Sequence, residues 1–191
     1  MSYQTYTTEA IVCGSYDRLT ADRNYLLFTE TAGMVFAAAR SAREERSKQR
    51  YALQDFTHIR VSLVKGRSGW RIGSVESIAN YYLGATDRGV RGTVVGVVQF
   101  LRRLLTGEEA NQAVFADTVA FLSHTNTLAS ARLATAYDIY QLRTLAHLGY
   151  VASNNTYASF LQPGTQWLEQ SMDQPVQANK AIEHGLNASQ L

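Results

Sequence analysis

The chain has 191 residues, of which 46% are hydrophobic and 18% charged, and its formal net charge is +2 at pH 7. This is an ordinary globular composition, sufficient for one large domain or two small ones with a buried core. Charged residues interrupt every apolar run well before the ~20 residues that a membrane helix needs, and no charged-then-apolar leader opens the chain, so we expect a cytosolic protein. Cys13 is the single cysteine, which excludes an internal disulfide.

Positive charge is concentrated in residues 40–71, which carry nine basic and three acidic side chains and are therefore net +6. The rest of the chain is net negative, because the whole is +2. The basic residues are Arg40, Arg43, Arg46, Lys48, Arg50, Arg60, Lys65, Arg67 and Arg71. A basic first half joined to a slightly acidic second half indicates two units with different partners.

Five segments of the first half favour β-strands, because they are rich in Thr, Tyr, Val and Ile or alternate apolar with polar residues. They are Tyr6–Tyr16, Asn24–Glu30, Met34–Ala39, His58–Lys65 and Trp70–Glu76. A Thr-Ala-Gly turn precedes the third segment and a Gly-Arg-Ser-Gly turn precedes the fifth. The alternation places Arg60 and Arg71 on the outer face of neighbouring strands.

Strands of this number and spacing predict a small barrel, either the oligonucleotide/oligosaccharide-binding (OB) fold or a plain SH3-like barrel. The hydrophobic period changes from two to about 3.6 near residues 74–77, which predicts an all-helical second half. The expected helices are Ser77–Leu83, a long one between Asp87 as N-cap and Gly107, Glu108–Leu122, Leu128–Leu148, a short one around Trp167 and Leu168, and Val176–His184. The fold class is therefore α+β, with a barrel domain at 1–76 and a helical domain at 77–191. The sequence leaves open whether residues 151–191 pack onto the helices or form a loosely packed tail.

A nucleic-acid surface needs cations for phosphates and flat side chains for bases. The candidate DNA-binding residues are Arg40, Arg43, Arg46, Lys48, Arg50, Tyr51, Arg60, Lys65, Arg67 and Arg71. We expect Tyr51 to be free to stack, whereas Phe28 and Trp70 are expected in the core. A solvated loop is the other interpretation of the same charge run.

Enzymatic signatures are weaker. The histidines are His58, His124, His147 and His184, and no two have metal-ligand spacing on a helix. There is no phosphate-binding glycine loop, and Cys13 has no basic neighbour in sequence, so we expect it to be a buried core residue. We therefore expect no catalytic residue, cofactor, metal or small-molecule substrate.

Six stretches occur in an order typical of a known family: residues 8–16, 25–33, 39–41, 52–56, 74–77 and 142–150. The last, Leu-Arg-Thr-Leu-Ala-His-Leu-Gly-Tyr, is the most specific. In this order they resemble the RecO family of bacterial DNA repair and recombination mediators. The resemblance implies an N-terminal OB barrel followed by a helical domain, in a non-enzymatic protein of the bacterial cytoplasm and nucleoid.

The resemblance also implies partners. Such proteins bind single- and double-stranded DNA, anneal complementary strands, contact the acidic tail of single-strand-binding protein, and work with RecR to load RecA. Relatives place basic residues for that tail near the start of the helix that carries the His-Leu-Gly-Tyr run, where Arg132 and Arg143 are the nearest cations here. Many relatives carry a four-cysteine zinc site after this helix; this chain has none of those cysteines, so no zinc is expected, and it is shorter than the family pattern.

Two other function classes remain open. A protein-interaction adaptor could use the basic barrel to hold an acidic protein surface, and it would bind DNA weakly or not at all. A nuclease would need a metal or a His/acid constellation, which the sequence does not show.

Overall fold

In the computed structural model of the chain, residues 5–17, 23–39, 48–67, 69–152, 157–168, 170 and 175–189 are described. The chain divides into two compact units. The first comprises Met1–Gly84 and Val94–Gln112, and the second comprises Ala85–Thr93 and Ala113–Leu191. The expected domain boundary between residues 76 and 77 stays a prediction, since compactness alone does not show where an independently folding domain ends.

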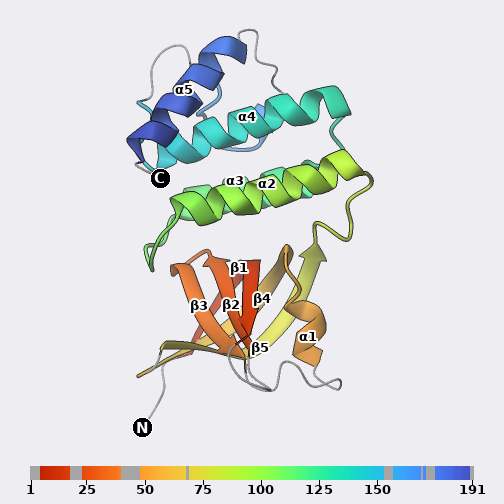
Figure 1. Cartoon of the computed structure of the whole chain (residues 1–191), viewed down its shortest axis with the longest axis vertical. Helices are drawn as coiled ribbons and strands as arrows, with labels where there is room; N and C mark the ends of the chain where they lie inside the picture. Colours follow the sequence, from red (N-terminus) through yellow and green to blue (C-terminus); the bar gives the residue numbers. More distant parts are fainter. Residues whose placement is uncertain are drawn as a thin grey trace. The chain divides into compact units, whose positions relative to one another are not determined.

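Five strands in the first unit close into a barrel in the order β1-β2-β3-β5-β4 (Figure 1). Their bounds are β1 Thr5–Asp17, β2 Arg23–Thr29, β3 Gly33–Ala39, β4 Thr57–Gly66 and β5 Gly69–Asn80. All five predicted strands are therefore confirmed. A short helix, α1 (Lys48–Ala52), lies between β3 and β4.

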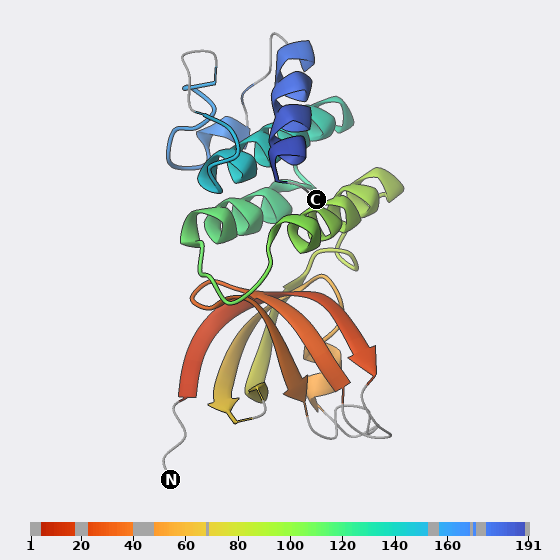
Figure 2. The same cartoon turned by 60° about the vertical axis from the view of Figure 1, so that its left-hand side comes forward.

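The long strand β1 closes the barrel, because it curves so that it pairs antiparallel with both β2 and β4 (Figure 2). The pairing of β3 with β5 is parallel and short, joining Ala37 to Trp70 and Ala38 to Arg71. A closed five-stranded barrel with this crossover, followed by helices, confirms the OB fold and the α+β class.

The barrel interior is filled by the inward-facing side chains of all five strands. Phe28 is completely buried and Trp70 is 7% exposed, as predicted for both. Cys13 is also buried, and this burial raises its thiol pKa to about 12, so the prediction of a buried core cysteine is confirmed. The thiol is therefore protonated and inert at neutral pH.

The predicted helix Ser77–Leu83 is wrong, because β5 continues to Asn80. The end of β5 pairs with the start of β4, with Ser77 opposite Ile59 and Asn80 opposite Thr57. The Asn80 amide donates to the Thr57 hydroxyl at 2.7 Å and fixes this end of the strand pair.

Helix α2 (Arg88–Leu104) begins as predicted, since the Asp87 carboxylate accepts a hydrogen bond from the Val90 N–H at 3.0 Å. The first unit contains its C-terminal part. Helix α3 (Gln112–His124) begins four residues later than predicted, which leaves Glu108 and Glu109 in the segment between α2 and α3 rather than in a first helical turn.

The second unit contains α4 (Ser130–His147), a 3-10 turn at Gln166–Leu168 and α5 (Pro175–Ala188), close to the predicted positions. Its core includes an aromatic cluster in which the Phe121 ring stacks on Tyr140 with centroids 5.1 Å apart and lies 6.2 Å from Trp167. Helix α5 packs on α4, and Gly185 permits the close approach because a Cβ there would meet the Leu145 side chain. The segment 157–168 thus contributes Trp167 to the core of this unit.

Candidate nucleic-acid interface

Helix α1 presents two of the predicted DNA-binding residues to solvent. Arg50 is exposed, and Tyr51 is 71% exposed, the largest exposed fraction among the large hydrophobic side chains described. The helix is fixed to the barrel by Gln49, whose side-chain amide donates to the Gly73 carbonyl of β5 at 2.8 Å. Helix α1 therefore carries an exposed cation and an exposed aromatic ring at the barrel surface.

Arg60 lies on the outer face of β4, as predicted, and is 58% exposed. Its guanidinium donates to Glu9 of β1 at 3.3 Å, and the second Glu9 oxygen faces His58 Nε2 at 2.9 Å. Burial lowers the pKa of His58, although the facing Glu9 opposes this shift. Glu9 therefore orients the Arg60 guanidinium, which stays accessible to an anionic ligand.

The β4–β5 hairpin carries three more predicted cations. Lys65 donates to Glu108 at 2.6 Å and lies 5.0 Å from the centre of the Trp70 ring. Arg67 is exposed at the hairpin turn. Arg71 is half-buried and makes further contacts within the protein. Only part of this positive charge is thus available to a partner.

Arg40, Arg43 and Arg46 lie outside the described residues, and the side chain of Lys48 does as well. Their assignment to DNA binding therefore stays a prediction.

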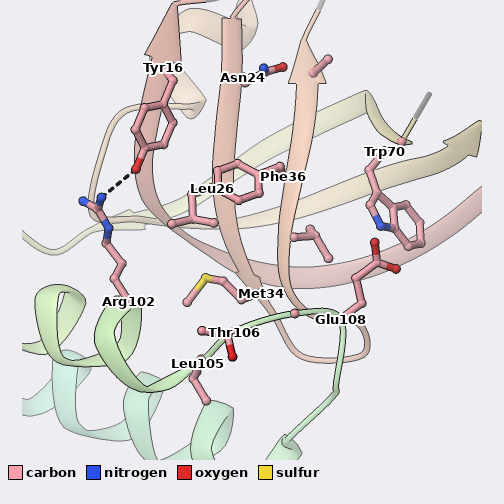
Figure 3. Close-up of a pocket in the computed structure, with 14 residues that line it drawn as sticks. Tyr16, Asn24, Leu26, Met34, Phe36, Trp70, Arg102, Leu105, Thr106 and Glu108 are labelled. Carbon is pink, nitrogen blue, oxygen red and sulfur yellow. Dashed lines mark hydrogen bonds between the residues drawn. The ribbon is translucent and has the colours of Figure 1, made fainter. Parts of the chain in front are cut away.

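A pocket on the outer face of β2 and β3, within the first unit, was missed by the sequence analysis (Figure 3). Its volume is about 700 Å³. The lining residues include Tyr16, Leu26, Met34, Phe36, Trp70, Arg102, Leu105 and Glu108. The signal that could have found it is the alternation in β3, where Val35 and Ala37 point inward and Phe36 between them is 60% exposed.

One end of the pocket is built by two aromatic rings and an arginine. Tyr16 and Phe36 have ring centroids 6.0 Å apart at an angle of 55°. The Arg102 guanidinium, from the C-terminal part of α2, donates to the Tyr16 hydroxyl at 2.6 Å and lies 6.0 Å from its ring centre (Figure 3). This arrangement holds the Tyr16 ring in place while 42% of the residue remains exposed.

The segment after α2 forms the opposite border. The Met34 N–H at the start of β3 donates to the Gly107 carbonyl at 3.0 Å, so this segment is attached to the strand. Glu108 points toward Trp70 (Figure 3). The hydrogen bond and the positive charge of Lys65 hold the pKa of Glu108 below its usual value, so its carboxylate is ionised at neutral pH.

In the second unit, Arg143 does not meet the expectation of a tail-binding residue, because it is 2% exposed. Its guanidinium forms two hydrogen bonds with Asp117 at 2.8 and 2.9 Å, and it also donates to the carbonyls of Phe160 and Gln162. All of these contacts lie within the helical unit. Arg132, at the start of α4, is exposed and remains available.

Within the described ranges, no group of three or more His, Cys, Asp or Glu side chains could hold a metal ion. None of the helices described there is both long and apolar enough to cross a membrane.

Comparison with known proteins gives a consistent result. Residues 1–81 match the family model described as recombination protein O N terminal. The chain is 26% identical over 147 residues to a DNA repair protein RecO of Myxococcus xanthus (strain DK1622), covering 76% of this chain and 59% of that protein. It is 30% identical over 153 residues to one of Nocardioides sp. (strain ATCC BAA-499 / JS614), covering 78% and 61%. The chain thus spans about three fifths of the length of these curated relatives.

Proposed function

We propose that this chain, which belongs to the recombination protein O family through its N-terminal domain, acts in DNA repair and recombination. In this proposal it does so by binding DNA. The observation that carries the proposal is a five-stranded OB barrel whose surface combines exposed cations with an exposed aromatic ring. The residues are Arg50, Tyr51, Arg60 and Arg67.

The cations would contact phosphates, which carry no sequence information, and Tyr51 would stack on a base. Such a surface favours binding that depends little on sequence and weakens as salt rises, because each phosphate contact releases counterions. Arg40, Arg43, Arg46, Lys48, Lys65 and Arg71 belong to the same proposed surface.

The finer functions are proposals by analogy with the family: binding of both single- and double-stranded DNA, strand annealing, and work with RecR in loading RecA. We also propose that Arg132 contributes to binding the acidic tail of single-strand-binding protein, whereas Arg143 is engaged internally. In this proposal the protein performs no catalysis and works in the bacterial cytoplasm, at the nucleoid.

The test is to replace Arg50 and Arg67 together by alanine and to measure DNA affinity at several salt concentrations. The proposal predicts weaker binding to every sequence and a salt slope reduced by about one unit per lost phosphate contact. Arg132→Ala is the matched control, because it removes an exposed arginine from the helical unit and should leave the slope unchanged. A double variant with the affinity and slope of the parent would contradict the assignment.

The second candidate is a protein-interaction adaptor. One observation favours it: Arg60 forms an ion pair with Glu9, and Lys65 forms one with Glu108. The same cations could form ion pairs with carboxylates on an acidic protein partner. An adaptor would show little DNA binding at low salt, so the same titration separates the two functions.

A further inference from the structure

The ion pair between Lys65 and Glu108 occupies one of the predicted DNA-binding cations. Lys65 Nζ lies 2.6 Å from Glu108 Oε2, and the two side chains are 53% and 45% exposed. The ammonium also lies 5.0 Å from the centre of the Trp70 ring, which attracts a cation. In the free protein, a carboxylate oxygen of the chain itself therefore lies where an oxygen of a bound phosphate would lie.

The backbone on both sides of Glu108 fixes its position. The preceding residue, Gly107, accepts a hydrogen bond from the Met34 N–H at 3.0 Å, which attaches this segment to the start of β3. The following residue, Glu109, packs so closely on Gly33 that a Cβ there would overlap its backbone. Glu108 is therefore presented to its lysine partner at a high effective concentration, against which a free anion in solution competes poorly.

A DNA strand differs from a free anion because its phosphates are linked. Arg67 is exposed two residues after Lys65, at the turn of the same hairpin. A strand whose phosphate is held by Arg67 presents a neighbouring phosphate to Lys65 at an effective concentration of its own, so it can displace Glu108. The displaced side chain is already 45% exposed, so water completes its hydration without any rearrangement of the core.

The other ion pair on the barrel surface, between Arg60 and Glu9, is less suited to displacement. Glu9 also faces the Nε2 atom of His58 at 2.9 Å, and the His58 side chain is only 6% exposed. A carboxylate held by a buried group as well as by an arginine is retained when a phosphate approaches the arginine. Displacement by DNA is therefore assigned to Glu108.

We propose that Glu108 is a built-in competitor for phosphate at Lys65, and that DNA displaces it on binding the barrel. The inference rests on the proposed DNA-binding function and adds to it a residue that opposes binding. Glu108 keeps isolated anions off this lysine and admits a polyanion that also contacts neighbouring cations. Removing this carboxylate should strengthen DNA binding, whereas removing a cation should weaken it.

The test is a double-mutant cycle at these two positions, in which the full chain is titrated into a labelled single strand of ~30 nucleotides at low salt. Glu108→Gln should bind the strand roughly two- to fivefold more tightly than the parent, as expected when one exposed ion pair no longer competes. In a Lys65→Ala background the same substitution should change the affinity little, because the contested cation is absent. Lys65→Ala should accordingly cost more affinity in Glu108→Gln than in the parent.

Glu109→Gln is the matched control, because it removes the same charge from the next residue, whose side chain is exposed. It should bind the strand as the parent does. General repulsion between DNA and negative charge would instead make Glu109→Gln as effective as Glu108→Gln. Circular dichroism establishes that each variant is folded.

The inference is overturned if Glu108→Gln binds no more tightly than the parent, if Glu109→Gln gains as much, or if the gain is the same with and without Lys65. The proposed DNA binding still stands in these cases, because the parent binds the strand. If the parent itself does not bind at low salt, the inference and the proposed function are both overturned.

Discussion

Replacement of Asp117 by asparagine tests the interaction that organises the helical unit. Asp117 of α3 accepts two hydrogen bonds from Arg143 and faces His147 Nε2 at 2.9 Å, both on α4. Arg143 also holds the carbonyls of Phe160 and Gln162, so the 157–168 segment depends on the same guanidinium.

The expected cost follows from burial. The Arg143 side chain is 3% exposed and that of Asp117 is 10% exposed, so the guanidinium of the variant would remain buried without its carboxylate partner. Removing one partner of a buried pair costs roughly 3–5 kcal/mol. Because two backbone carbonyls still accept from Arg143 and asparagine can accept one bond, we expect the lower end, about 3 kcal/mol.

The free energy of unfolding that Asp117→Asn loses should depend on pH. Burial alone would raise the pKa of Asp117, but hydrogen bonds from His147 and Arg143 outweigh it and lower the pKa below 3.8. Because the folded-state pKa is depressed, the stabilisation is present above pH 3.8 and is lost as the pH falls through the folded-state value. The difference between the parent and Asp117→Asn should therefore shrink in acid.

The assay is urea unfolding followed by the fluorescence of Trp167, which is 1% exposed and whose ring centre lies 5.0 Å from the Arg143 guanidinium. A Trp70→Phe background removes the other tryptophan. Asp138→Asn is the matched control on α4, because burial raises the Asp138 pKa and neutralising it should stabilise the unit. A loss below about 1 kcal/mol for Asp117→Asn, or a loss that persists unchanged in acid, would refute the reasoning.

Two further predictions concern the barrel. Gly33→Ala should destabilise the first unit by at least ~2 kcal/mol, because Gly33 has φ +69° and a Cβ there would overlap the backbone of Glu109; an unchanged melting temperature would contradict this. Cys13 should react with a thiol reagent at neutral pH only as fast as the barrel unfolds, since it is buried and protonated. Rapid labelling of the native protein would show that the thiol is accessible.

The strands could be predicted because their signals are local. Alternation in residues 58–65 and the Thr-Ala-Gly turn before β3 specify burial and chain reversal without knowledge of distant partners. The barrel order follows less directly, and the sequence left two barrel types open. The parallel pairing of β3 with β5, which this barrel order requires, joins segments more than 30 residues apart.

The errors occurred where distant contacts decide the conformation. The end of β5 is a strand because β4 pairs with it, although residues 77–83 alone favour a helix. Glu108 stays outside α3 because Lys65 binds it and the preceding Gly107 is bonded to β3. The internal role of Arg143 depends on Asp117, 26 residues away. Arg143 and His147 are four residues apart, so both lie on one face of α4. This spacing was the sequence signal that could have indicated a shared partner within the helical unit.

The most direct test of the account is the binding of a labelled single strand of ~30 nucleotides to the full chain by fluorescence anisotropy at two salt concentrations. The account predicts binding at low salt that weakens steeply as salt rises, because exposed cations of the barrel contact phosphates. No binding at low salt, or affinity independent of salt, would contradict it.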